Sequence, residues 1–135
     1  MLNKINIKHL LVFSLLLMVV QIFIGTGVRE FIDEQTKLYG RLNKDLWLSN
    51  PSFNFYFHRS FSILIFLVNG LLFIISKKLN MSMKYINVVM ILILFEIIIG
   101  AVMYYFSFPI MSQPLHLMIA ILIFVIQFYW YFKIN

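Results

Sequence analysis

The chain has 135 residues, 62% of them hydrophobic, and its mean hydropathy of +0.93 excludes an ordinary soluble domain and indicates a membrane protein. The net charge of +6 does not indicate nucleic acid binding, because the basic residues flank apolar stretches, as they do beside membrane spans. The absence of cysteine excludes disulfides, thiolate ligands, iron–sulfur clusters and covalently attached c-type heme.

Four apolar stretches are each long enough to cross a membrane as a helix, which takes roughly 20 residues. They run over about residues 10–28, 53–76, 85–106 and 114–132. The first stretch is too long for a signal peptide and no small-residue cleavage site follows it, so we expect it to be retained. The expected fold is all-α: a single four-helix transmembrane bundle over residues 1–135.

The connection at residues 29–52 differs from the other flanks of the spans, because it carries both acidic and basic residues. Within it, apolar residues at near-helical spacing over residues 29–42 predict a helix lying at the membrane interface. The N-terminus, the loop between the second and third spans, and the C-terminus carry lysines without acids: Lys4, Lys8, Lys77, Lys78, Lys84 and Lys133. By the positive-inside rule, both termini face the cytoplasm of a bacterial-type plasma membrane and loop 29–52 lies outside.

Polar residues recur within the spans at offsets that keep them on one helical face, which we expect to point into the bundle. These residues are Ser14, Gln21 and Gly25 in the first span, His58, Ser62 and Asn69 in the second, and His116, Ala120 and Gln127 in the fourth. A short unit also occurs twice: Gln21 to Gly25 followed by His58, and Glu96 to Gly100 followed by His116. We interpret this unit as a weak internal repeat.

The two histidines are the strongest candidates for a functional site. An ionisable side chain in hydrocarbon is costly and calls for a partner or a function. Both lie less than roughly 8 Å below the expected outer boundary, at 1.5 Å per residue. Two imidazoles at one depth on opposing helices suit an iron held from both faces of a heme, so His58 and His116 are candidate metal ligands.

Four further residues are candidates for binding the same group. They are Gly25, Gly100, Arg59 and Gln21. The two glycines would remove side-chain bulk beside a flat macrocycle, and Arg59 would pair with a heme propionate. Purely structural interpretations stay open. The glycines would then be packing residues and the histidines hydrogen-bonding residues. Glu96 would be a buried carboxyl paired with Gln21 rather than a proton carrier.

At these residues the chain resembles the heme A synthase family of cytochrome oxidase assembly proteins. The matching segments are Gln21-Ile-Phe-Ile-Gly25-Thr-Gly-Val-Arg29-Glu30, His58-Arg59-Ser60, Glu96-Ile-Ile-Ile-Gly100 and Pro114-Leu-His116-Leu117. The resemblance implies one four-helix half of an eight-helix architecture, more similar to the C-terminal half that binds a cofactor heme. It also implies that His58 and His116 are axial ligands of a heme, most simply b-type, with heme O or heme A as alternatives.

The chain departs from the catalytic half of that family at two features. Phe55 stands where that half has a glutamate three residues before its His-Arg pair, and the outer-loop cysteine pair is absent. Glu96 and Glu30 are weak candidates to replace the missing acid. Whether this chain oxidises heme O to heme A therefore stays open.

We expect a half-size heme A synthase-like protein that acts in heme A biosynthesis or cytochrome oxidase assembly. Its expected partner is a second copy or a separately encoded four-helix half, with heme O synthase or cytochrome oxidase as further candidates. The alternatives are a bis-histidine b-type cytochrome relay and a non-catalytic membrane assembly factor.

Overall fold

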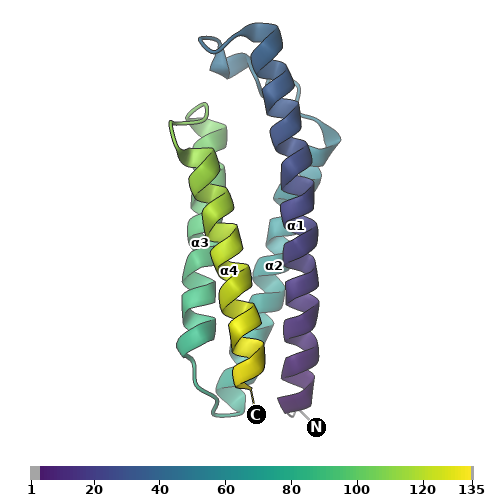
Figure 1. The fold of residues 1–135 in the computed structure, drawn as a ribbon, viewed down its shortest axis with the longest axis vertical. Helices are drawn as coiled ribbons and strands as arrows, with labels where there is room; N and C mark the ends of the chain where they lie inside the picture. The colour runs from purple at the N-terminus through teal and green to yellow at the C-terminus, as the bar shows by residue number, and fades with distance from the viewer. Residues whose placement is uncertain (1–3, 135) are drawn as a thin grey trace.

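The computed structural model describes residues 4–134 and consists of four long helices with one short 3-10 helix. The elements are α1 (Lys4–Tyr39), η1 (Lys44–Leu46), α2 (Phe53–Lys78), α3 (Lys84–Tyr105) and α4 (Ser112–Lys133). The helices run up and down beside one another, and both ends of the chain lie at the same end of the bundle (Figure 1). All four are long and apolar enough to cross a membrane, which confirms the expected all-α, four-span fold.

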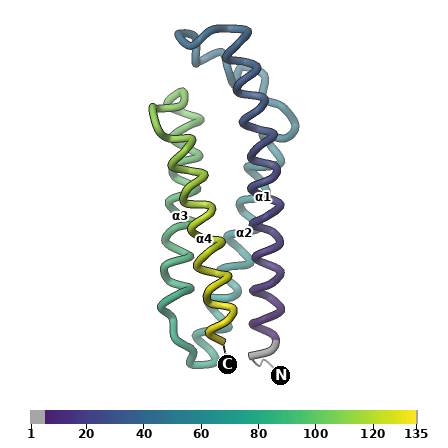
Figure 2. The backbone as a smooth tube through the Cα atoms, viewed as in Figure 1, coloured from purple at the N-terminus to yellow at the C-terminus, as the bar shows by residue number. Residues whose placement is uncertain are grey.

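Two antiparallel hairpins make up the bundle: α1 packs mainly on α2, and α3 mainly on α4. The hairpins join through α1 against α4 and α2 against α3, so α2 and α4 lie diagonally across the bundle (Figure 2). We call the end with both chain termini the terminal end, and the opposite end, with η1 and the α3–α4 connection, the η1 end. This arrangement brings the two histidine-bearing helices to face each other across the bundle axis.

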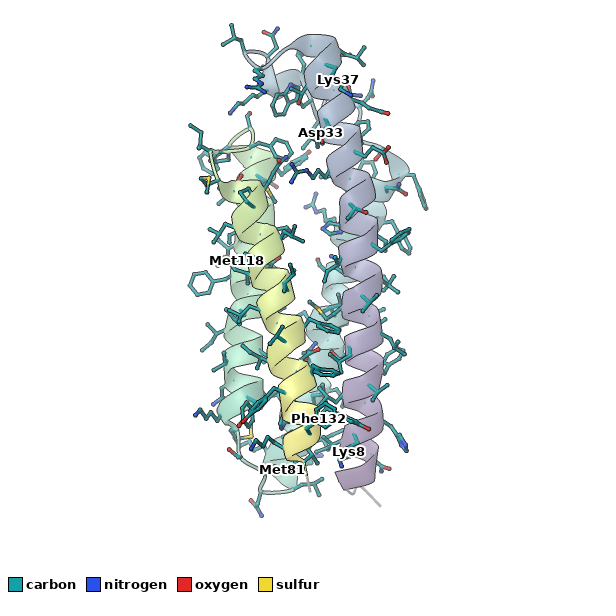
Figure 3. The ribbon with its side chains drawn as sticks, in the orientation of Figure 1. Lys8, Asp33, Lys37, Met81, Met118 and Phe132 are labelled. Atoms are coloured by element: carbon teal, nitrogen blue, oxygen red, sulfur yellow. The ribbon has the colours of Figure 1, made fainter. Side chains whose placement is uncertain are left out.

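The first helix differs from its prediction, because α1 does not end near residue 28 but continues to Tyr39. The expected separate interfacial helix over residues 29–42 is therefore largely part of α1. No glycine or proline interrupts residues 28–39, and the helix ends at Gly40, whose φ of 78° suits a glycine after a helix C-terminus. Asp33 and Lys37 lie on this extension, which rises beyond the α3–α4 hairpin (Figure 3).

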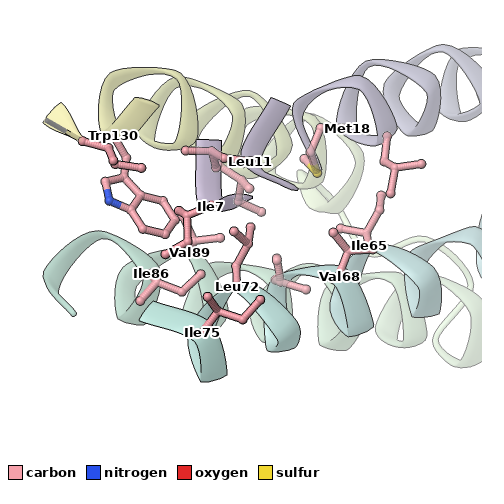
Figure 4. Close-up of a cluster of buried hydrophobic side chains, with 14 of the residues drawn as sticks. Ile7, Leu11, Met18, Ile65, Val68, Leu72, Ile75, Ile86, Val89 and Trp130 are labelled. Carbon is pink, nitrogen blue, oxygen red and sulfur yellow. The ribbon is translucent and has the colours of Figure 1, made fainter. Parts of the chain in front are cut away.

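The main hydrophobic core occupies the half of the bundle nearer the terminal end. Leu11 of α1, Leu72 of α2 and Val89 of α3 are fully buried there, and Trp130 of α4 is 2% exposed. Figure 4 shows these side chains converging from all four helices. This packing closes one half of the bundle and leaves the other half free to form a cavity.

A polar cluster crosses the bundle beside this core. Asn69 Nδ2 donates to Ser14 Oγ at 3.0 Å, and Gln127 Nε2 donates to Asn69 Oδ1 at 2.7 Å and to Ser14 Oγ at 3.0 Å. All three side chains are fully buried, which confirms that the predicted polar faces of α1, α2 and α4 point inward. Each bond joins two helices, so the cluster fixes their relative register.

Candidate functional site

A cavity of about 340 Å³ lies in the η1 half of the bundle, and residues of all four long helices line it. Its wall is mainly apolar, with a few polar side chains converging on it, as is common for binding sites of small molecules. The predicted site residues Gln21, Gly25, His58, Arg59, Glu96, Gly100 and His116 are all among the lining residues. The structure thus brings these residues together in one cavity.

His58 reaches the cavity from the first turns of α2. Ser52 caps this helix, since its Oγ accepts a hydrogen bond from the backbone N–H of Phe55 at 3.4 Å. The imidazole lies against Gly25 of α1, where an added β-carbon would be 3.1 Å from Cε1. Gln21 Nε2 donates to the His58 carbonyl at 3.1 Å, while His58 Nδ1 is buried without a hydrogen-bond partner. The α1–α2 hairpin therefore holds the backbone at His58 but leaves Nδ1 free.

His116 reaches the same cavity from the start of α4. Pro114 is tolerated there because it lies in the first helical turn. Glu96 of α3 places Oε2 2.7 Å from His116 Nδ1, although the approach departs from the direction that an N–H bond on that atom would take. Gly100 lies further along α3, where an added β-carbon would be 3.8 Å from Cε1 of His116. The α3–α4 hairpin therefore holds the imidazole ring itself.

The two imidazoles face each other across the bundle, with ring centroids 6.2 Å apart and ring planes at 68°. They come from the diagonal helices α2 and α4. Each ring lies beside the glycine of its own hairpin, and each histidine contacts the Gln or Glu of that hairpin. The short repeat in the sequence is therefore a repeat in space.

The two copies differ in the contact that the polar residue makes. Gln21 donates to a main-chain carbonyl, whereas Glu96 contacts an imidazole nitrogen. The alternative pairing of Glu96 with Gln21 does not occur, because each contacts a histidine instead. Glu30, the other acid considered for a catalytic role, is exposed on α1 and is not among the residues that line the cavity.

Aromatic residues form the cavity wall near the η1 end. Phe55 stacks on Tyr104 with ring centroids 5.6 Å apart, and the Arg59 guanidinium lies 5.7 Å from the centroid of the Tyr104 ring. Phe108 of the α3–α4 connection also lines the cavity. Neither Tyr104 nor Phe108 was assigned a role in the site from the sequence. Helical spacing from Gly100 to Tyr104 was the available signal for placing Tyr104 on the same face.

A second cavity of about 420 Å³ lies beside the first, toward the η1 end. The two share Ile32, Phe108 and Gln113. Lys44 Nζ donates to the Phe108 carbonyl at 3.2 Å, and the Trp47 ring lies 5.8 Å from that of Phe108. The segment after α1 is thereby tied to the α3–α4 connection beside the mouth of the site.

The donor set is two imidazoles without further ligands. Within residues 4–134, no group of three or more histidine, aspartate or glutamate side chains is arranged to hold a metal ion. A structural zinc usually takes four protein ligands and a catalytic zinc three, so the pair does not match such a site. Two imidazoles on opposite sides of a cavity suit a metal whose other ligands belong to a bound cofactor.

In a comparison with known protein families, the model of the COX15-CtaA family, described as cytochrome oxidase assembly protein, matches residues 3–128. Comparisons with curated proteins and with solved structures found no match. The family match covers nearly the whole chain, and the matched range contains both histidines and extends into α4.

Proposed function

Because this chain belongs to the family of cytochrome oxidase assembly proteins, we propose that it binds a heme between His58 and His116 and acts in heme A biosynthesis. The family match agrees with the predicted resemblance to heme A synthases and with an integral membrane protein. The observation that carries the proposal is the pair of imidazoles facing each other inside the cavity, 6.2 Å apart between centroids.

The spacing of the two rings supports a shared metal. An imidazole nitrogen binds a metal at about 2 Å, so two rings on opposite sides of one iron have centroids roughly 6 Å apart. Gly25 and Gly100 keep side-chain bulk away from both rings. These features together fit a heme with His58 and His116 as axial ligands.

A bound heme supplies one-electron redox chemistry. The protein's own residues position and enclose it. Arg59 and Arg29 line the cavity and offer planar cations suited to the carboxylates of the macrocycle. The mainly apolar wall would exclude water from the bound group. We propose heme b as the resident group, with heme O or heme A as alternatives.

The proposal extends to the assembly and its placement. A single four-helix unit with one site corresponds to half of the architecture that the family resemblance implies, so the partner is a second copy or a separate four-helix half. Heme O synthase or cytochrome oxidase would be the neighbours in the same membrane. The lysines at the terminal end support a cytoplasmic location of that end, in a bacterial-type plasma membrane.

A second function is favoured by one observation, the apolar residue at the position of the catalytic acid. Phe55 lines the cavity and stacks on Tyr104, so no carboxylate approaches the site from that position. This supports a b-type electron relay, or a supporting subunit, over an oxidation of heme O by this chain alone.

The test is a reduced-minus-oxidised visible spectrum of the detergent-purified protein, with extraction of the pigment as its pyridine complex. A low-spin spectrum with extracted heme supports the site, and His9→Ala is the matched control because His9 is exposed far from the cavity. Heme O or heme A in the extract supports the biosynthetic role, and heme b alone supports the relay. A colourless protein that takes up no added hemin would contradict the proposal.

A further inference from the structure

We infer that the two imidazoles are unequal ligands: Glu96 makes His116 the permanent ligand, whereas His58 exchanges for a small neutral ligand of heme iron such as carbon monoxide. The inference rests on the proposed heme site. An iron bound by two imidazoles has no free coordination position. Exchange of His58 would supply one.

The contact of Glu96 distinguishes His116. Its Oε2 lies 2.7 Å from Nδ1, and the two side chains are 14% and 23% exposed, so water competes little for the contact. A carboxylate on the second nitrogen of a ligating histidine fixes the tautomer and ring orientation and raises the basicity of the ligand. Because the Glu96 carboxylate lies beside Nδ1, Nε2 is the nitrogen that remains for a metal.

His58 lacks an equivalent support. Nδ1 is buried without a hydrogen-bond partner in both histidines, but a carboxylate oxygen lies 2.7 Å away only at His116. Gln21 donates its amide N–H to the main-chain carbonyl of His58 instead. Gln21 Oε1 is also buried without a partner. A rotation of that side chain would offer His58 a neutral acceptor, and bonds to neutral acceptors are roughly half as strong as bonds to carboxylates. The ring of His58 is therefore the more easily displaced of the two.

Ligand exchange on the His58 side is chemically balanced. The bond between iron and imidazole nitrogen breaks, a bond between iron and the carbon of carbon monoxide forms, and no electron or proton is transferred. The displaced imidazole stays attached to α2. The bond on the His116 side is retained throughout.

The experiment compares hemin-loaded wild-type protein with His58→Ala, His116→Ala and the control His9→Ala. We expect His9→Ala to match wild type. His58→Ala should keep hemin in a high-spin state, return to low spin when free imidazole is added, and bind carbon monoxide when reduced at least tenfold more tightly than wild type. His116→Ala should bind hemin at least tenfold more weakly than His58→Ala. Equal behaviour of the two variants, or the reverse order, would overturn the inference.

Circular dichroism and gel filtration would reveal whether His116→Ala fails to fold. A second variant, which keeps both histidines, tests the inference even in that case. Glu96→Gln retains a hydrogen-bonding group but removes the carboxylate, so the reduced state should be favoured at least tenfold, a rise of about 59 mV in midpoint potential for one electron. Glu34→Gln, an exposed acid on α1, should leave the potential unchanged. An unchanged potential in Glu96→Gln would overturn the inference.

The outcomes separate this inference from the proposed function. If wild-type protein takes up no hemin, the heme site itself is wrong and the inference falls with it. If wild-type protein binds hemin in a low-spin state but the histidine variants behave alike, the heme site stands and only the inequality of the ligands is refuted.

Discussion

Gly25 lies against the imidazole of His58 so closely that an added β-carbon would be 3.1 Å from Cε1 and 3.5 Å from Nδ1. The equivalent glycine of the other hairpin is less tightly packed, with 3.8 Å between an added β-carbon at Gly100 and Cε1 of His116. The first distance is shorter than an ordinary van der Waals contact, whereas the second is ordinary. The two copies of the repeat therefore tolerate a side chain differently.

We predict that Gly25→Ala weakens hemin binding and that Gly100→Ala changes it little. The added methyl group at Gly25 forces the His58 ring away from its position, and an off-rotamer side chain costs about 0.5–1.5 kcal/mol. That corresponds to a loss of up to roughly tenfold in affinity. Hemin titration of the two variants checks this, and equal affinities would contradict the role assigned to Gly25.

Much of this fold follows from sequence because the apolar runs are long and lysines flank several of them. The end of α1 was missed for a physical reason. Charged residues after Val28 indicated an exit from the membrane, but nothing in residues 28–39 breaks a helix, so α1 continues beyond the apolar run. Exit from a membrane and the end of a helix are separate events.

The site was predicted in part. Helical periodicity placed Ser14, Asn69 and Gln127 on inward faces, but it gives no axial register between helices, so their mutual hydrogen bonds were not predictable. The repeat grouped Gln21 with His58 and Glu96 with His116, and each pair is in contact in the structure. Only the structure distinguishes a main-chain contact from a ring contact.

Removal of the central polar residue should destabilise the bundle. Asn69→Ala deletes the hydrogen bonds of Asn69 to Ser14 and Gln127, each of which joins two helices. Hydrogen bonds between membrane helices contribute about 0.6 kcal/mol on average and up to about 1.7, so we expect a loss of about 1–2 kcal/mol. Denaturant titration in mixed micelles measures it. Asn87→Ala, at an exposed position of α3, serves as the control, and an equal effect of the two would contradict the role of the cluster.

The segment after α1 should loosen when Trp47 is removed. The residue is 7% exposed, its ring packs beside Phe108, and its Nε1–H donates to the Gly40 carbonyl at 3.2 Å. Trp47→Ala removes both contacts, so amide hydrogen exchange in residues 40–52 should accelerate while exchange within α2 and α4 stays unchanged. Leu42→Ala, at a residue 98% exposed, should leave exchange as in wild type. Protection that persists in Trp47→Ala would show that other contacts hold the segment.

The orientation of the bundle can be tested directly, because the natural chain has no cysteine to mask. Ser49→Cys lies after η1, and Ser82→Cys lies in the α2–α3 connection; both positions are exposed. Lys77, Lys78 and Lys84 flank Ser82 and favour the cytoplasmic side, since translocating basic residues is disfavoured. A membrane-impermeant maleimide added to intact cells should therefore label Ser49→Cys and leave Ser82→Cys unlabelled until the membrane is permeabilised. The reverse pattern would place the terminal end outside, and the histidine pair would then open toward the cytoplasm.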